Sequence, residues 1–162
     1  MQLIAPSAGY ASEGTVCFVL DRSTQRLLLG LKKRGVGVGK YNGFGGKLEP
    51  GETAREAAAR ELWEESGITV IPDFLQPMGH VCFPHVQQRM HVFVVTKWQG
   101  TPQESEEMMP QWFSLSAIPY PQMWPTDAAW LPFVLDGKQI TVVVHRRPDG
   151  QRICEFIEAT AC

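Results

Sequence analysis

The stretch that decides the fold runs from Gly46 to Ile68 and reads GKLEPGETAREAAARELWEESGI. Residues 53–66 predict a helix, because a threonine stands at its start as an N-cap and Glu56, three residues later, completes a capping box. Gly67 follows as the expected C-terminal stop. The helix is preceded by a glycine-dense segment, residues 35–51, which favours a tightly folded loop over a helix.

Three acidic side chains, Glu61, Glu64 and Glu65, lie on this predicted helix. Glu61 and Glu65 are roughly 40° apart around the axis and one turn apart along it. Like charges at this spacing repel, so the stack is tolerated best where a cation lies between them. Magnesium prefers such oxygen ligands and also binds substrate phosphates. The alternative is an ordinary solvated acidic face.

The neighbours of the acidic cluster add to this interpretation. Arg60 precedes the cluster and Glu52 lies at the entrance of the helix, so an Arg60–Glu52 pair would tie the glycine loop to the helix. The glycines allow the loop to approach the helix closely. A backbone carbonyl there, at Gly45, is a candidate further metal ligand.

The whole stretch resembles the Nudix box, G-x5-E-x7-R-E-U-x-E-E-x-G-U, in which U is an apolar residue, and every fixed position is present. The resemblance implies an α/β fold, an α/β/α sandwich around a mixed β-sheet, which we expect to form a single domain over residues 1–162. It also implies Mg²⁺, with Mn²⁺ as an alternative, held chiefly by Glu61 and Glu65 with Glu64 close by. The implied reaction is cleavage of a nucleoside diphosphate linked to another group.

Alternation of apolar residues and turn signals predicts the remaining elements. Helix 127–135 is expected to begin near Asp127, and Pro148-Asp149-Gly150 is expected to turn a closing hairpin. The expected strands are 15–20, 26–31, 68–71, 78–83, 90–98, 111–114, 140–145 and 153–157.

Two longer segments, 32–53 and 99–127, resemble the branch of the Nudix family that hydrolyses oxidised purine nucleoside triphosphates such as 8-oxo-dGTP or 2-oxo-dATP. The resemblance assigns base recognition to Asn42, Trp124 and Asp127. An amide pairs with a purine edge, an indole stacks on it, and a buried carboxyl with a raised pKa donates a hydrogen bond. The same resemblance lines the pocket with Thr15, Lys32 and Phe83.

Each of these residues also has an ordinary interpretation. Asn42 fits a turn, Trp124 fits a core, and Asp127 fits a helix N-cap. The chain departs from the branch at Thr126, where the branch has a second aspartate; because threonine does not titrate near neutral pH, we expect fewer oxidised bases to be accepted. Val36 and His85 replace aromatic pocket residues, and the hairpin at 86–90 is shorter.

The implied products are a nucleoside monophosphate and pyrophosphate, formed as metal bridges Glu61, Glu65 and the triphosphate. Glu64 and Glu107 are both candidates for the general base, and the resemblance also places Glu107 near the metal; its alternative is an exposed acidic loop. Lys47 either contacts phosphate or is solvated.

The composition of the chain limits the kinds of partner that the protein can bind. The 162 residues carry a net charge of −2, without the basic excess that proteins binding a nucleic-acid polymer usually show, so we expect a small nucleotide substrate. The four cysteines show no C-x-x-C pair, which disfavours a zinc site. No signal-peptide pattern or membrane span is visible, and we expect a cytoplasmic monomer.

Hydrolysis of ADP-ribose, a dinucleotide or capped RNA is the alternative within the family, and a non-catalytic nucleotide-binding module is the alternative outside it.

Overall fold

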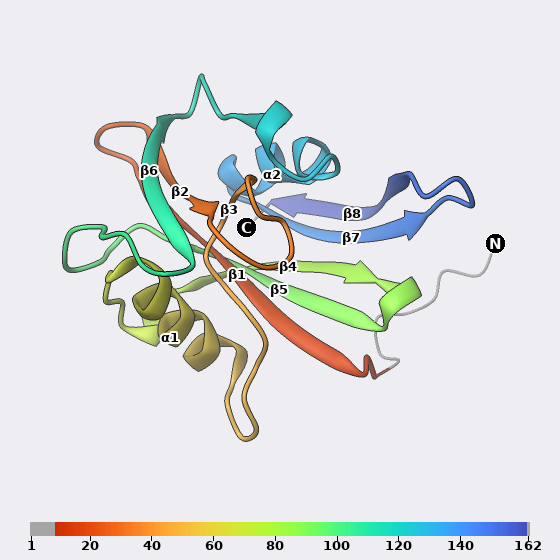
Figure 1. Cartoon of the computed structure of the whole chain (residues 1–162), viewed down its shortest axis with the longest axis horizontal. Helices are drawn as coiled ribbons and strands as arrows, with labels where there is room; N and C mark the ends of the chain where they lie inside the picture. Colours follow the sequence, from red (N-terminus) through yellow and green to blue (C-terminus); the bar gives the residue numbers. More distant parts are fainter. Residues whose placement is uncertain (1–8, 162) are drawn as a thin grey trace.

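A computed structural model describes residues 9–161 and shows one mixed sheet lying between two helices (Figure 1). The fold class predicted from the sequence is therefore confirmed. The predicted domain boundaries, 1–162, extend beyond the described residues at both ends. The elements are β1 (Ser12–Asp21), β2 (Arg26–Lys32), β3 (Tyr41–Asn42), α1 (Ala54–Ser66), β4 (Gln76–Phe83), β5 (Gln88–Val95), β6 (Met108–Ser114), α2 (Asp127–Leu135), β7 (Lys138–Arg146) and β8 (Arg152–Ala161).

The sheet has eight strands in the order β3-β2-β1-β5-β4-β7-β8, with β6 also paired to β2. β1 runs parallel to β5, and β4 runs parallel to β7. The other pairs are antiparallel. The two parallel pairs make the sheet mixed, and β1 lies near its middle.

Two apolar cores cover the two faces of the sheet. Phe18 and Leu20 of β1 point into the core that contains α2, while Cys17 and Val19 point into the core that contains Leu62 of α1. This alternation follows from the period of two along a strand. A strand buried on both faces explains why residues 15–20 are almost uniformly apolar.

The predicted limits of α1 are confirmed by its caps. The Thr53 hydroxyl accepts from the Glu56 backbone N–H at 3.2 Å, and the Glu56 carboxylate accepts from the Thr53 N–H at 3.0 Å. Gly67 adopts the left-handed conformation at the C-cap, with φ of 75°. The helix that carries the acidic cluster is therefore fixed at both ends.

Two strand predictions need correction. Residues 68–71 form no strand; only Thr69 pairs, with Gln99, and Pro72 then starts a short 3-10 helix. The apolar pattern there reflects Ile68 and Val70 packing under α1 rather than ladder pairing. The strand expected over 90–98 ends at Val95.

Gly79 permits the closing hairpin to join the sheet. Its φ is +100°, and a Cβ atom there would lie 1.7 Å from the carbonyl oxygen of Ile140 on β7. Glycine therefore allows β4 to bulge and still pair with β7. The predicted turn at residues 148–150 is present, with the Gly150 N–H donating to the Arg147 carbonyl at 2.9 Å.

Cys17 and Cys82 are buried free thiols. The side chain of Cys154 is not described, and Cys162 lies outside the described residues. Within residues 9–161, no helix is long and apolar enough to cross a bilayer.

Candidate functional site

The glycine loop passes so close to β1 and α1 that side chains are excluded. A Cβ atom on Gly45 would lie 1.8 Å from the Thr15 carbonyl oxygen, and one on Gly46 would lie 2.5 Å from the Glu61 carboxylate. The close approach lets the Gly45 N–H donate to Glu65 Oε1 at 2.8 Å. The structure therefore gives Gly45 an observed role through its amide, whereas the metal role predicted for it stays a prediction.

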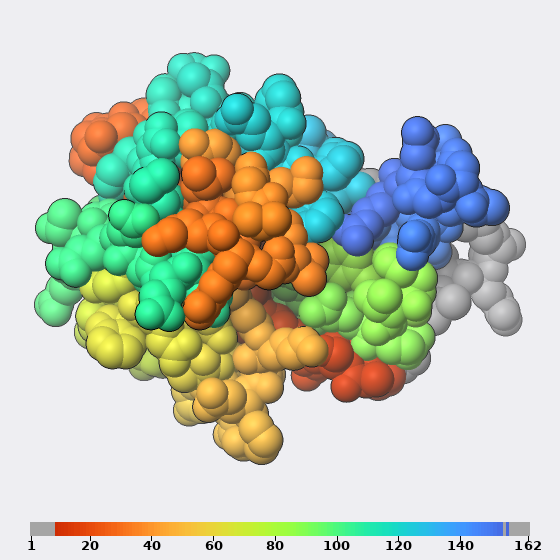
Figure 2. Space-filling model, in the orientation of Figure 1, coloured from red at the N-terminus to blue at the C-terminus, as the bar shows by residue number. Residues whose placement is uncertain are grey.

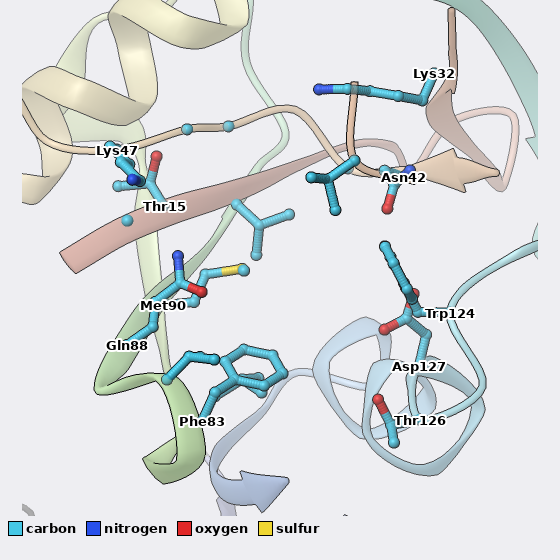
Figure 3. Close-up of a pocket in the computed structure, with 18 of the residues that line it drawn as sticks. Thr15, Lys32, Asn42, Lys47, Phe83, Gln88, Met90, Trp124, Thr126 and Asp127 are labelled. Carbon is cyan, nitrogen blue, oxygen red and sulfur yellow. The ribbon is translucent and has the colours of Figure 1, made fainter. Parts of the chain in front are cut away.

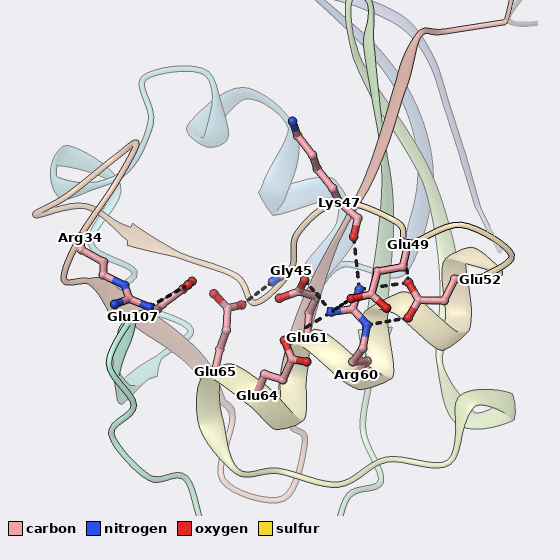
Figure 4. A network of polar contacts seen from close by, with 10 residues as sticks. All are labelled: Arg34, Gly45, Lys47, Glu49, Glu52, Arg60, Glu61, Glu64, Glu65 and Glu107. Carbon is pink, nitrogen blue, oxygen red and sulfur yellow. Dashed lines mark hydrogen bonds and ion pairs between the residues drawn. The ribbon is translucent and has the colours of Figure 1, made fainter.

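Arg60 ties the loop to the helix, as expected from the sequence (Figure 4). Its guanidinium donates to both oxygens of Glu52, at 2.5 and 3.0 Å, and to the Lys47 carbonyl at 3.2 Å. It also donates to Glu61 at 2.9 Å and to Glu64 at 3.3 Å. One cation thus offsets part of the repulsion between Glu61 and Glu64.

The carboxylates predicted to hold metal line one cavity of about 510 Å³, which we call the carboxylate cavity. Glu107 reaches it from the segment before β6, where it pairs with Arg34 at 3.4 Å and Lys32 at 3.8 Å. Glu107 is therefore not merely part of an exposed acidic loop. The lining includes Lys32, Arg34, Gly45, Gly46, Glu61, Glu64, Glu65, Ser105, Glu106 and Glu107.

Burial dominates the electrostatics of the two central carboxylates. Desolvation raises the pKa of Glu65 to about 8, against the Gly45 hydrogen bond, and it also raises the pKa of Glu61. In the described residues, no three His, Cys, Asp or Glu side chains converge into a ligand set by themselves. Glu61 instead contacts Arg60, and Glu65 contacts Gly45. Their oxygens nevertheless suit a hard divalent cation, which would favour their charged forms.

A second cavity of about 600 Å³ adjoins the first, and we call it the base cavity. Every residue predicted to bind substrate lines it (Figure 3). Its walls come from the glycine loop, the segment leading into α2, the β4–β5 turn and the β7–β8 hairpin, which lie together on one face of the molecule (Figure 2). The predicted residues that line it are Thr15, Lys32, Asn42, Lys47, Phe83, Trp124, Thr126 and Asp127.

The two cavities share part of their lining, namely Lys32, Gly45, Gly46 and Glu65. Lys47, in contrast, lines only the base cavity, so its side chain is not placed among the carboxylates. A ligand with a base at one end and a polyphosphate at the other would span both cavities.

Asp127 is the first residue of α2, and burial raises the pKa of its carboxyl to about 7. The N-cap interpretation is wrong: the cap position belongs to Thr126, and no side-chain cap bond is formed there. Thr126 itself is buried and lines the base cavity. The acid that can carry a proton therefore faces the cavity beside a hydroxyl.

Asn42 and Trp124 are likewise positioned by their neighbours. Asn42 belongs to β3, opposite Gly30 of β2, and its amide donates to the Lys40 carbonyl at 3.1 Å. It is therefore more than a turn residue. The half-buried Trp124 lies under Lys40, whose Nζ is 5.3 Å from the ring centroid, and against Gly37, where a Cβ atom would be 2.9 Å from the indole.

Sequence reasoning missed two arginines, and it placed Thr15 in the pocket without foreseeing that the Thr15 hydroxyl would lack a hydrogen-bond partner in the described part of the chain. Arg34, adjacent to the glycine loop, lines the carboxylate cavity, and its place in the chain was a usable signal. Arg152 lines the base cavity from a hairpin far away in the sequence, and nothing local marks it. The buried Thr15 hydroxyl lines the base cavity without a hydrogen-bond partner among the described residues, so it is available to a group that enters the cavity.

Comparison with known proteins agrees with this arrangement. An oxidized purine nucleoside triphosphate hydrolase from Mus musculus is 49% identical over 125 residues, which are 75% of this chain and 79% of that protein. Its counterpart from Danio rerio is 48% identical, over 70% of this chain and 74% of that protein. A solved MutT protein from Bacillus halodurans superposes with a TM-score of 0.73 and 25% identity, covering 90% of this chain and 97% of that one. Since the NUDIX domain family also matches residues 12–151, the chain belongs to the Nudix hydrolase family.

Proposed function

We propose that the protein hydrolyses oxidised purine nucleoside triphosphates, such as 8-oxo-dGTP or 2-oxo-dATP, to the monophosphate and pyrophosphate. The observation that carries the proposal is the contact between two unlike cavities, one lined by carboxylates and one by Asn42, Trp124 and Asp127. They meet at Lys32, the glycine loop and Glu65, which is where the phosphate chain would pass from the base to the acidic helix.

The carboxylate cavity fits a divalent cation, and we propose Mg²⁺, with Mn²⁺ as an alternative, held by Glu61, Glu64, Glu65 and Glu107. Oxygen-rich, partly buried donors match the preference of these ions. When bound, the ion would neutralise the phosphate charge and lower the pKa of a coordinated water. The Gly45 N–H donates to the Glu65 carboxylate, and Arg60 donates to Glu61. The positions of both carboxylates are therefore fixed by the chain before a cation binds.

Two side chains are proposed for accepting the proton of the attacking water. Glu64 is half-exposed and accepts a hydrogen bond from Arg60 at 3.3 Å. Glu107 is half-exposed and held by Lys32 and Arg34. Lys32 lines both cavities, so we assign it, rather than Lys47, the contact to phosphate. Comparing Glu64→Gln with Glu107→Gln separates the two bases, because only loss of the true base removes the acidic limb of the pH–rate profile.

At the other end, the base would be read by Asp127 and Asn42 while stacking on Trp124. A protonated Asp127 donates through one oxygen and accepts through the other, whereas an ionised one only accepts. Burial raises the pKa of this carboxyl to about 7, so both forms are available near neutral pH. Thr126 supplies a hydroxyl that does not titrate in this range, which supports a narrower set of bases than two acids would accept.

We further propose a cytoplasmic monomer that removes oxidised precursors before they enter DNA. The net charge of −2 supports a small nucleotide rather than a nucleic-acid polymer as the substrate.

The test is a panel of 8-oxo-dGTP, 2-oxo-dATP, dGTP, ADP-ribose and a dinucleotide, each assayed with Mg²⁺ for the phosphate product released. We expect pyrophosphate and a monophosphate from the oxidised triphosphates, with higher kcat/KM than for dGTP. Preference for ADP-ribose or the dinucleotide would favour the alternative within the family. Binding without turnover of any compound would favour a non-catalytic module.

A further inference from the structure

Arg152, the first residue of β8, reaches the base cavity although it lies outside the resemblance drawn from the sequence. Its guanidinium carbon is 4.9 Å from the centroid of the Trp124 ring, within the range of a cation–π contact. It also lines the base cavity. Two separate observations therefore place Arg152 where the nucleotide base would lie. It contacts Trp124, the proposed stacking residue, and it lines the base cavity.

The topology of the sheet explains this position. β4 directs Val81 and Phe83 into the base cavity, and β7 runs parallel beside β4. β7 ends at Arg146, which pairs directly with Arg152 across the hairpin. The β7–β8 hairpin therefore returns beside the segment that leads into α2 (Figure 2). Its residue Arg152 lines the base cavity there.

The donors of Arg152 are available to a ligand. Among the described residues, no carboxylate lies within ion-pair distance of Arg152, whereas Arg34 and Arg60 are both paired. The amide of Asn42, another donor in the cavity, spends one of its two N–H groups on the Lys40 carbonyl and keeps the other for a ligand. A guanidinium carries five N–H donors in a planar fork, which suits carbonyl oxygens on a flat ring.

The structure assigns Arg152 as a base-binding residue that donates hydrogen bonds to an oxo oxygen of the purine stacked on Trp124. An oxidised purine has one carbonyl acceptor more than its parent, so a donor at this wall favours the oxidised base. The assignment rests on the proposed function, because that function supplies the oxidised purine.

The test uses the product 8-oxo-dGMP, so that binding is measured by calorimetry without turnover. We expect Arg152→Ala to weaken binding about tenfold, as loss of a charge-assisted hydrogen bond does. Arg152→Lys keeps the charge but not the fork, and should recover less than half of the loss. Arg147→Ala, in the adjacent turn and outside both cavities, is the matched control and should bind as the wild type does.

Inorganic tripolyphosphate, which has no base, is the second probe. Its inhibition constant against 8-oxo-dGTP hydrolysis should be the same for wild type and Arg152→Ala. Equal 8-oxo-dGMP binding by wild type and Arg152→Ala, full recovery by Arg152→Lys, or weaker tripolyphosphate inhibition in Arg152→Ala would each overturn the assignment. Arg152-dependent binding of 8-oxo-dGMP by a wild type that hydrolyses no oxidised triphosphate would refute the proposed function and leave the assignment standing.

Discussion

Replacing Asp127 by asparagine should make the protein more stable at high pH while weakening its choice of base. Burial raises the pKa of Asp127 from its ordinary value of 3.8 to about 7. Between these values the folded state holds a proton that the unfolded chain releases. The native protein therefore loses stability as the pH rises from about 4 to about 7, and above that range the full penalty applies.

The magnitude follows from the size of the shift. Each pKa unit corresponds to about 1.4 kcal/mol, so the penalty above pH 7 is at most about 4 kcal/mol. Water entering the base cavity reduces it, and we expect Asp127→Asn to gain about 2 kcal/mol relative to wild type at about pH 8 compared with about pH 4.5. Glu65, whose pKa is also raised, is common to both proteins and cancels from the difference.

The assay is urea unfolding followed by tryptophan fluorescence at both pH values. Asp136→Asn is the control, because Asp136 follows the last turn of α2 but is exposed. In parallel, the ratio of kcat/KM for 8-oxo-dGTP to that for dGTP should fall about tenfold in Asp127→Asn, since an amide cannot alternate between donor and acceptor at one oxygen. If the stabilities of wild type and Asp127→Asn change equally with pH, the carboxyl is not buried as described; if selectivity is unchanged, Asp127 does not read the base.

Three further substitutions test the proposed metal ligand Glu65 and the two residues, Gly45 and Arg60, that position the carboxylates. Glu65→Gln should lower kcat at least about 100-fold, because a neutral amide is a poor ligand for a hard cation. Glu56→Gln, on the same helix, is the control and should retain activity. A kcat of Glu65→Gln within a few-fold of wild type would show that Glu65 does not bind the metal. Gly45→Ala should cost about 3 kcal/mol or more in urea unfolding, since its Cβ atom would meet the Thr15 carbonyl oxygen at 1.8 Å, whereas Gly9→Ala meets nothing within 4 Å and should be neutral; equal losses would contradict the packing. Arg60→Lys loses the two hydrogen bonds to Glu52, so the free energy of unfolding should fall by about 1–2 kcal/mol and kcat should fall as well. Unchanged activity would show that the Arg60–Glu52 contact is not needed for the site.

The parts of the fold that sequence reasoning predicted well are those with local causes. The limits of α1 follow from Thr53, Glu56 and Gly67, each of which acts within a turn of the helix. The segment at residues 68–71 was misassigned because buried apolar residues beside a helix look like a short strand, and only pairing partners distant in the chain distinguish the two.

In the candidate site, too, the residues with local sequence signals were predicted and those that depend on distant contacts were not. The acidic stripe and the Arg60–Glu52 tie come from one contiguous stretch, so spacing alone indicated them. Arg152 could not be found in this way, because its contact with Trp124 depends on the pairing of β7 with β4 and on the bulge at Gly79. The direction of the Asp127 pKa shift was expected from the sequence, but the size of the shift depends on burial that only the folded chain provides.

The central claim is that acidic side chains of α1 hold a divalent cation on the phosphate chain of a nucleotide whose base lies in the neighbouring cavity. A crystal structure with Mg²⁺ and a non-hydrolysable analogue of 8-oxo-dGTP tests it most directly. We predict a cation bonded to oxygens of Glu61, Glu65 and the phosphates, with the purine against Trp124 and Asp127. A nucleotide bound with its phosphates away from Glu61 and Glu65, or with no ion beside them, would contradict the account.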